Sequence, residues 1–274
     1  MRVKKIGKTS LNNAMILLFI GFLVLPIFWI FTMSFKQFVD IISYPPKFIF
    51  SPTIENYRQV FASEFPRFLL NSIIITGGAI FVGAITGVPA AYALAQANWR
   101  KKEDLAFTFL SFRFAPEFAV ILPLFAIYQT LHLYDTYVGM ILVHELIVLP
   151  LIIWICRGFF SDVPVAINEA AIIDGATHWQ RLRYVYIPIA APGLVSAGII
   201  AFISSWNNLL FGLVLSGKAT QPVTMGILQA MTFNQIKWGE MAASACVAAI
   251  PGIIFAVYLQ KYLIKGITVG AIKE

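Results

Sequence analysis

Charged residues are scarce in this chain of 274 residues: Asp, Glu, Lys and Arg make up 12% of it, whereas 59% is hydrophobic. Soluble globular domains are typically about half apolar and about a quarter charged. The shortage of charge therefore excludes an ordinary soluble domain and indicates an integral membrane protein.

Cysteine is scarce as well, because the chain contains only Cys156 and Cys246. Both lie in apolar runs without paired spacing, so neither a disulfide framework nor a metal site is indicated. The sequence also lacks a Cys/His pair and a serine-nucleophile elbow. We therefore expect no catalytic residues, no metal and no cofactor in this chain.

Short alternating segments of the kind found in outer-membrane barrels are missing, and the apolar runs are near or beyond the roughly 20 residues of a spanning helix. The sequence thus predicts an all-α integral membrane protein. A single six-span transmembrane domain is expected over residues 11–264, between an N-terminus at 1–10 and a tail at 265–274. The predicted transmembrane helices are residues 11–35, 68–96, 105–131, 137–160, 188–211 and 241–264.

The first apolar run follows a basic N-terminus, as a signal peptide does. It is longer than a typical signal-peptide core, however, and no small-residue cleavage site follows it. We therefore expect an uncleaved first span.

The Lys and Arg residues predict the orientation. Thirteen of the 20 lie on the side of the N-terminus, namely Arg2, Lys4, Lys5, Lys8, Arg100, Lys101, Lys102, Arg157, Arg181, Arg183, Lys261, Lys265 and Lys273. Positive charge marks the cytoplasmic side, so both termini and a polar loop at 161–187 are expected there. Since the net charge of +7 sits in short segments between spans, no nucleic-acid partner is expected.

Several polar residues fall inside predicted spans, where ionisable groups are costly and often functional. Arg113 and Glu117 stand one helical turn apart and are predicted to form a buried charge pair. His144 and Glu145 suit either a polar packing contact or a substrate contact.

Ser205, Trp206, Asn207 and Asn208 interrupt the fifth apolar run near its outer end. Amides beside an indole suit a sugar, because hydroxyls need donors and acceptors while sugar C–H faces stack on aromatic rings. The alternative is a Trp belt at the membrane interface.

Small residues mark the second span, where Gly83 and Gly87 are spaced for close approach of helix backbones. We expect them to pack within the chain rather than to form a dimer. In the outer segment before that span, Thr53 is predicted to cap a short helix over 54–61.

The segment from Gly212 to Ala219 nearly matches the phosphate-binding pattern GxxxxGK[ST]. The position that needs Ser or Thr is Ala219, no strand is predicted before it, and the expected topology places it outside the cell. We therefore predict a glycine-rich outer loop.

The most informative stretch is the polar loop 161–187. Pro164 suits the start of a short helix over 164–174 and Gly175 its end, while Thr177 can cap a second helix that leads to the fifth span. Residues 163–178 contain no Lys or Arg, which disfavours a helix that rests on lipid headgroups. This short helix is therefore predicted to dock on a protein.

The loop resembles the EAA loop of bacterial ATP-binding-cassette (ABC) importer permeases. The pattern EAA-x-x-DGA, followed after eleven residues by a proline, is matched at Glu169, Ala170, Ala171, Asp174, Gly175, Ala176 and Pro188. Further similarities run along almost the whole chain, at Pro45-Pro46, Asn56-Tyr57, Asn71-Ser72, residues 90–95, Trp206-Asn207, Trp238-Gly239, residues 241–244, Pro251 and residues 266–271. This set is similar to the smaller permease of maltose-type and glycerol-3-phosphate-type importers, the carbohydrate-uptake branch.

The resemblance implies the transmembrane domain of a type I ABC importer in a bacterial or archaeal cytoplasmic membrane. Its partners would be a second, related permease, a cytoplasmic ATPase dimer that binds ATP and Mg, an extracytoplasmic sugar-binding protein and membrane lipid. The six EAA-loop residues Glu169 to Ala176 would couple the ATPase to transport. Glu169 is expected to contact a basic residue of the ATPase, while Gly175 permits the turn.

Other functions remain as alternatives. A polyol or a sugar phosphate is the alternative substrate. An ion-coupled secondary transporter would use Arg113, Glu117, His144 and Glu145 as a relay, but such folds often contain inverted repeats and none is seen here. A channel-like subunit has no supporting filter pattern.

Overall fold

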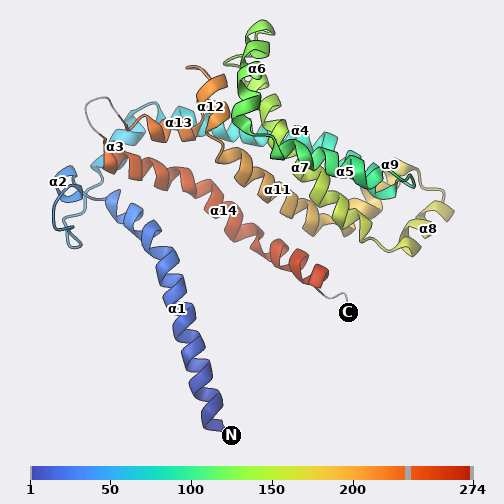
Figure 1. The fold of residues 1–274 in the computed structure, drawn as a ribbon, viewed down its shortest axis with the longest axis horizontal. Coiled ribbons are helices and arrows are strands. Elements are labelled where there is room, and N and C mark those ends of the chain that lie inside the picture. The colour runs from blue at the N-terminus through green and yellow to red at the C-terminus, as the bar shows by residue number, and fades with distance from the viewer. Residues whose placement is uncertain (1, 232–235, 272–274) are drawn as a thin grey trace. The chain divides into compact units, whose positions relative to one another are not determined.

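The computed structural model of the chain describes residues 2–231 and 236–271 (Figure 1). Met1 and residues 272–274, which belong to the expected terminal segments, lie outside the described ranges. The chain consists of two compact units. The first comprises Met1–Pro66 and Ile227–Ala249, and the second comprises Arg67–Gly226 and Ile250–Glu274.

The regular secondary structure of the described residues is helical, and their only β-type pairing is an isolated bridge between Met231 and Ile236. The all-α prediction is therefore confirmed. The helices are α1 (Arg2–Met33), α2 (Phe38–Ile41), α3 (Glu55–Ala62), α4 (Phe65–Gln96), α5 (Lys102–Ser111), the 3₁₀ turn η1 (Phe112–Phe114), α6 (Glu117–Thr130), α7 (Tyr137–Ser161), α8 (Val165–Ile173), α9 (His178–Arg181), the π-helix η2 (Leu182–Tyr186), α10 (Ile187–Ile189), α11 (Ala191–Trp206), α12 (Leu210–Leu215), α13 (Val223–Leu228) and α14 (Trp238–Ala271).

Four helical segments of the described chain are long and apolar enough to cross a membrane, and two bent pairs raise the number to six if each pair is one span. The four are Asn13–Met33, Phe65–Gln96, Tyr137–Ser161 and Trp238–Phe255. They agree with the first, second, fourth and sixth predicted spans.

The third predicted span is wrong as a continuous helix, whereas the fifth agrees with α11 and has a bend at its start. The third bends by 88° between Phe114 and Glu117, and the fifth bends by 80° at Ala190. Proline explains the positions of both bends, because it lacks a backbone N–H and restricts the conformation of the residue before it. Pro116 and its predecessor have extended backbones at the first bend, and Pro192 opens α11 just after the second.

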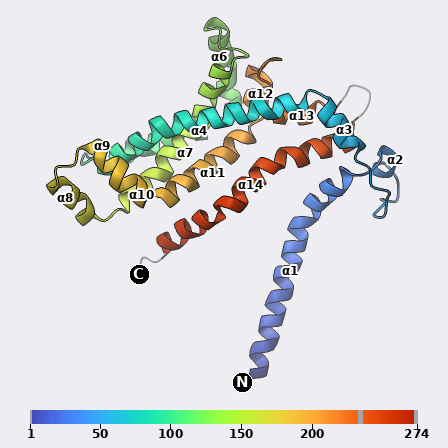
Figure 2. The ribbon, with the colours of Figure 1, turned by 180° about the vertical axis from the view of Figure 1, so that it is seen from behind.

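Close contacts between α7 and its neighbours α4 and α11 form the centre of the second unit, where the three helices lie side by side (Figures 1 and 2). A Cβ atom at Gly87 of α4 would lie 2.9 Å from Cγ2 of Ile152 on α7, and a Cβ at Gly193 of α11 would overlap the Phe159 ring. The glycines thus serve packing within the chain, as predicted for Gly83 and Gly87.

Polar side chains fix the end of this unit that is opposite α8. Asn71 Nδ2 of α4 donates to the carbonyls of Ala219 and Gln221 at 3.1 and 2.9 Å. The Asp135 carboxylate accepts from the backbone N–H of Thr220 at 2.9 Å and from its hydroxyl at 2.8 Å. We call Asn71, Asp135 and the loop 216–221 the outer clasp.

The hydrogen bonds of the outer clasp show what the segment from Gly212 to Ala219, which resembles a phosphate-binding loop, binds. Gly212 lies in α12, no strand precedes it in the described chain, and the N–H of Ala219 donates to Asp135 at 3.1 Å. The loop therefore binds a carboxylate of its own chain. The prediction of a loop holds for residues 216–219, whereas residues 212–215 belong to α12, and the outer location stays a prediction.

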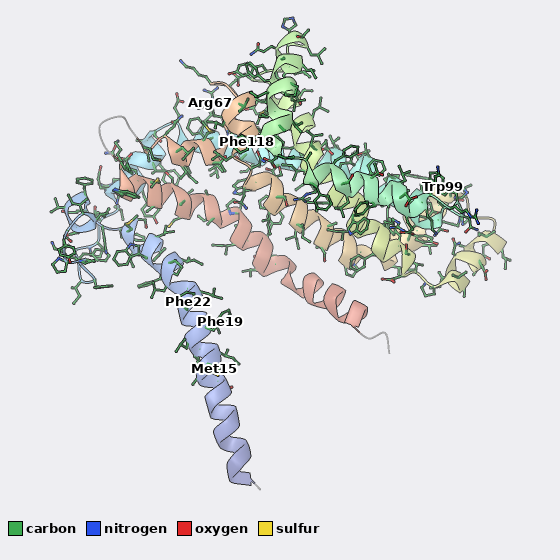
Figure 3. All side chains as sticks on the ribbon, viewed as in Figure 1. Met15, Phe19, Phe22, Arg67, Trp99 and Phe118 are labelled. Carbon is green, nitrogen blue, oxygen red and sulfur yellow. The ribbon has the colours of Figure 1, made fainter. Side chains whose placement is uncertain are left out.

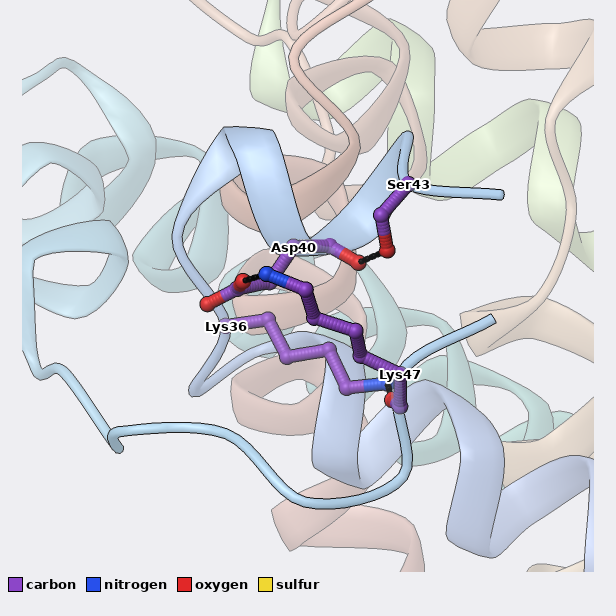
Figure 4. A network of polar contacts seen from close by, with 4 residues as sticks. All are labelled: Lys36, Asp40, Ser43 and Lys47. Atoms are coloured by element: carbon purple, nitrogen blue, oxygen red, sulfur yellow. Dashed lines mark hydrogen bonds and ion pairs between the residues drawn. The ribbon is translucent and has the colours of Figure 1, made fainter. Parts of the chain in front are cut away.

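In the first unit, residues 13–28 of α1 expose their side chains all round, with Met15, Phe19 and Phe22 standing away from the helix (Figure 3). The following loop is held together by Lys36 and Lys47. The buried Lys36 donates to the carbonyl of Lys47 at 2.7 Å, and Lys47 pairs with Asp40 at 2.6 Å (Figure 4).

The predicted helix after this loop is present as α3. Thr53 does accept the N–H of Glu55 at 3.1 Å, as expected of a cap. Ile54 rather than Thr53 occupies the N-cap position itself, so the predicted start is one residue early.

The contact between α7 and α11 predicts that alanine affects stability differently at two glycines of α11. Gly193→Ala should destabilise the protein by about 1–3 kcal/mol, because the new methyl group is forced into the Phe159 ring. Gly198→Ala is the matched control, since nothing lies within 4 Å of its Cβ position. Thermal unfolding of the detergent-solubilised variants measures both; equal midpoints would contradict the packing argument.

The outer clasp predicts a pH-dependent effect of Asp135→Asn. Partial burial alone would raise the pKa of Asp135, but hydrogen bonds from Ala219 and Thr220 outweigh it and hold the pKa below the ordinary value of an aspartate. The carboxylate therefore stabilises the fold above its unfolded-state pKa, and this stabilisation is lost as the pH falls through the lower folded-state value.

We expect Asp135→Asn to cost about 1–3 kcal/mol at about pH 7 and much less at about pH 3. Unfolding midpoints at the two pH values measure the effect, and Asp104→Asn, at an exposed position, serves as control. A difference from wild type that does not shrink on acidification would refute the assigned role.

Candidate functional site

The short helix of the 161–187 loop is present as α8, Val165–Ile173, and confirms the prediction of a helix near 164–174. Pro164 occupies the N-cap and Asp174 the C-cap. Gly175 follows with φ +78°, a left-handed conformation that suits glycine. The N–H groups of Gly175 and Ala176 donate to the carbonyls of Ile172 and Ala171, both at 3.0 Å, and close the helix end.

Most of the α8 surface is exposed in this chain. Ala171 is buried and Ala176 is half-buried, whereas Glu169, Ala170, Asp174 and Gly175 are exposed. Ile173 is 86% exposed and Val165 68%. The helix thus presents aliphatic side chains beside two carboxylates, a surface that fits a partner with an apolar groove and basic residues.

The second helix of the loop begins where the sequence predicts. Thr177 caps α9 with a capping box: its hydroxyl accepts the Gln180 N–H at 3.3 Å, and the Gln180 side chain accepts the Thr177 N–H at 2.8 Å. After the turn at 174–177, α9, η2 and α10 follow one another directly and lead, past the bend at Ala190, into α11, so that α8 is joined to the fifth span.

The structure divides the four residues near the end of α11 into two pairs. Ser205 is buried and donates to Thr76 at 3.2 Å, and Trp206 is buried and stacks on Phe202 at 5.2 Å between ring centroids. Asn207 and Asn208, in contrast, line an open cavity of about 410 Å³. Trp206 lines a different cavity of about 600 Å³ with an almost entirely apolar lining, so of these four residues the two asparagines are the polar ones that line a cavity.

The prediction of a buried charge pair between Arg113 and Glu117 is wrong for this chain. Both residues are exposed, and the ion pairs of the described residues include neither. The bend at Pro116 breaks the helix that would have set them one turn apart. Glu117 instead accepts a hydrogen bond from Asn208 Nδ2 at 3.2 Å.

Glu117 also lines the 410 Å³ cavity, together with Phe118, Ser204 and the two asparagines. Phe118 is 75% exposed and is labelled in Figure 3. A neighbouring cavity of about 160 Å³ is lined by Arg113 and again by Glu117. Phe118 has no distinguishing signal in a sequence with 24 phenylalanines, and only the bend reveals its place.

His144 and Glu145 lie at helix contacts of α7. The His144 ring is 2% exposed, with Nδ1 2.7 Å from the Met140 carbonyl, and it packs edge-on against Phe211. The Glu145 carboxylate faces Gly83 of α4 and is buried. Neither residue lines the cavities beside Glu117, and this placement suits the packing alternative better than the substrate alternative.

Within the described residues, no group of three His, Cys, Asp or Glu side chains is arranged to hold a metal ion. The two cysteines are free, with Cys156 buried in α7. Among the described residues, we take the exposed α8 and the cavity beside Glu117 as the candidate sites.

A family model described as "Binding-protein-dependent transport system inner membrane component" matches residues 83–269. The trehalose transport system permease protein SugB of Mycobacterium tuberculosis is 37% identical over 261 residues, covering 93% of this chain and 94% of that protein. The diacetylchitobiose uptake system permease protein DasC of Streptomyces coelicolor is 32% identical and covers 97% and 98%.

A crystal structure of a bacterial ABC transporter involved in the import of the acidic polysaccharide alginate contains a chain of the same fold. It matches with a TM-score of 0.77 at 23% sequence identity and covers 96% of this chain and 98% of that chain. The fold is therefore that of a solved ABC importer permease.

Proposed function

Because this chain belongs to the family of binding-protein-dependent transport system inner membrane components, we propose that it forms half of the translocation pathway of an ATP-driven sugar importer. It is a multi-pass inner-membrane permease that works with a binding protein and further ABC transporter subunits, and ATP hydrolysis belongs to a separate subunit. We further propose that a related permease completes the pathway and that an ATPase dimer docks on α8.

The single observation that carries the docking proposal is the surface of α8. A nine-residue helix with an 86% exposed Ile173 is marginal on its own, since helices below about 12–15 residues gain most of their stability from packing. A partner that covers Ile173 and pairs with Glu169 supplies the missing burial. The excess of Lys and Arg on this side of the spans supports a cytoplasmic location for α8 and for both termini.

The proposal of a sugar substrate draws on the relatives and on the cavity beside Glu117. The relatives SugB and DasC are named for the transport of trehalose and the uptake of diacetylchitobiose. In this chain, Glu117 and Asn208 offer acceptors and donors for hydroxyl groups, and the exposed Phe118 offers a ring for C–H stacking. A polyol or a sugar phosphate has similar chemistry and is the alternative ligand.

The described residues do not form the relay that the rival function, an ion-coupled transporter, would need. His144 contacts the Met140 carbonyl and Glu117 pairs with Asn208, so the four ionisable residues of the predicted relay form no continuous hydrogen-bonded chain among the described residues. Coupling through a docked ATPase accounts better for the exposed α8.

The proposal predicts that the tagged chain, purified gently from its native membrane, carries a second permease and an ATPase in stoichiometric amounts. Mass spectrometry of the purified sample tests the composition. Proteoliposomes of the complex with its binding protein should take up a labelled sugar only when ATP is present. Homogeneous chain that transports without ATP would overturn the proposal.

Gly175→Val tests the role of α8 directly. A β-branched residue at φ +78° costs about 1–3 kcal/mol of backbone strain, which displaces the end of the helix that carries Asp174. We expect a loss of sugar-stimulated ATP hydrolysis of about tenfold or more, with normal membrane insertion. Gly175→Asn is the matched control, because Asn tolerates this conformation and nothing lies within 4 Å of the Cβ position. Full stimulation in the Val variant would contradict the docking role.

A further inference from the structure

Four polar side chains form a directional chain of hydrogen bonds beside α8. Arg181 Nη1 donates to Asn168 Oδ1 at 2.9 Å, Asn168 Nδ2 donates to Gln96 Oε1 at 3.3 Å, and Gln96 Nε2 donates to the Tyr186 hydroxyl at 2.6 Å. The four residues come from α9, α8, α4 and η2, whose helices meet at the same end of the second unit (Figures 1 and 2). We call this set the inner network.

The inner network has one fixed end. Tyr186 is 1% exposed and packs edge-on against Tyr92 at 4.9 Å and Phe160 at 5.9 Å between ring centroids. This aromatic cluster belongs to the core that holds α4, α7 and α11 together. The two amides between the ends, Gln96 and Asn168, are half-buried, so they have room to move while Tyr186 does not.

The other end carries a charge that is costly to move. Arg181 is 7% exposed, and the ion pairs of the described residues do not include it. Its contacts are with the neutral Asn168 amide and with the His178 ring at 2.8 Å, while its Nε is buried without a partner. A buried guanidinium that loses a hydrogen bond pays a large desolvation penalty, so Asn168 cannot leave Arg181 without a replacement.

Between Arg181 and Tyr186 the backbone forms the π-helix η2. Single π-turns are rare and strained relative to α-helix, and they occur frequently at functional sites. The 80° bend of the fifth span follows four residues later at Ala190. The inner network thus joins α8 to the end of α4 and to the irregular segment that sets the direction of α11.

We propose that Gln96, Asn168, Arg181 and Tyr186 are positioning residues that pass a displacement of α8 to two membrane spans at once. Gln96, the last residue of α4, transmits it to the second span, and Arg181 with Tyr186 transmits it through η2 to the fifth. This proposal rests on the proposed function, because it requires α8 to be the helix that the ATPase moves. It adds the route by which that movement enters the membrane.

Gln96→Met and Gln96→Glu test the inner network as a pair. Met keeps the length of the side chain but removes both hydrogen bonds. Glu keeps an acceptor for Asn168 and accepts from the Tyr186 hydroxyl, which can reverse its role. In proteoliposomes of the whole complex, we expect the sugar transported per ATP hydrolysed to fall at least about fivefold in the Met variant and to stay within about twofold of wild type in the Glu variant.

This ratio separates positioning from a merely structural role, which would lower the amount of assembled complex but leave the ratio unchanged. Gln129→Met, at an exposed position near the end of α6, is the matched control. If Gln96→Met does not assemble, Tyr186→Phe removes only the terminal hydroxyl and should lower the same ratio about two- to tenfold.

The outcomes distinguish the two proposals. Wild-type complex without ATP-dependent uptake overturns the proposed function. Wild-type uptake together with an unchanged ratio in Gln96→Met, or in Tyr186→Phe where the first variant fails to assemble, overturns the inner network alone. An equal loss in the Met and Glu variants would also overturn it, because the hydrogen bonds would then not be what matters.

Discussion

The close approach of α4 and α11 to α7 is the constraint on which the rest of the second unit depends. Burial of apolar side chains provides little drive for helix association in lipid, so small residues that let backbones approach gain importance. Gly87 and Gly193 provide that approach, and larger residues such as Ile152 and Phe159 fill the space they leave. Since apolar contacts of this kind tolerate sliding, polar side chains are needed to set the register.

The second unit has polar groups at both ends of α4, and they differ in what they allow. The outer clasp binds the Asp135 carboxylate to backbone N–H groups and Asn71 to backbone carbonyls, and backbone atoms cannot turn away. The inner network holds the other end through the side-chain amide of Gln96, which can rotate. One end of α4 is therefore held by backbone groups, whereas the other is held by a side chain that can adjust.

Residues that begin or end helices locally allowed the 161–187 loop to be predicted well from the sequence. Pro164, Gly175 and Thr177 act through their own backbone or nearest neighbours, and the structure places each at the predicted helix end. The misses depend on tertiary structure. Proline within an apolar run is compatible with a kink or a full break, so Pro116 did not reveal the 88° bend. The pairing of Glu117 with Asn208, 91 residues away, follows only from that bend.

The nature of α8 explains why its connection to the spans is polar. The helix has nine residues and buries only Ala171, so apolar packing against its own chain holds it weakly. A large apolar contact would fix α8 in place. An exposed helix with hydrogen-bonded ends can shift as a rigid body, and in α8 Asn168 then keeps its hydrogen bond with the buried Arg181. Because the cost of abandoning Arg181 is high, the guanidinium must follow Asn168. Weak apolar attachment and one costly polar contact together allow a displacement of α8 to reach the spans, as the proposed route requires.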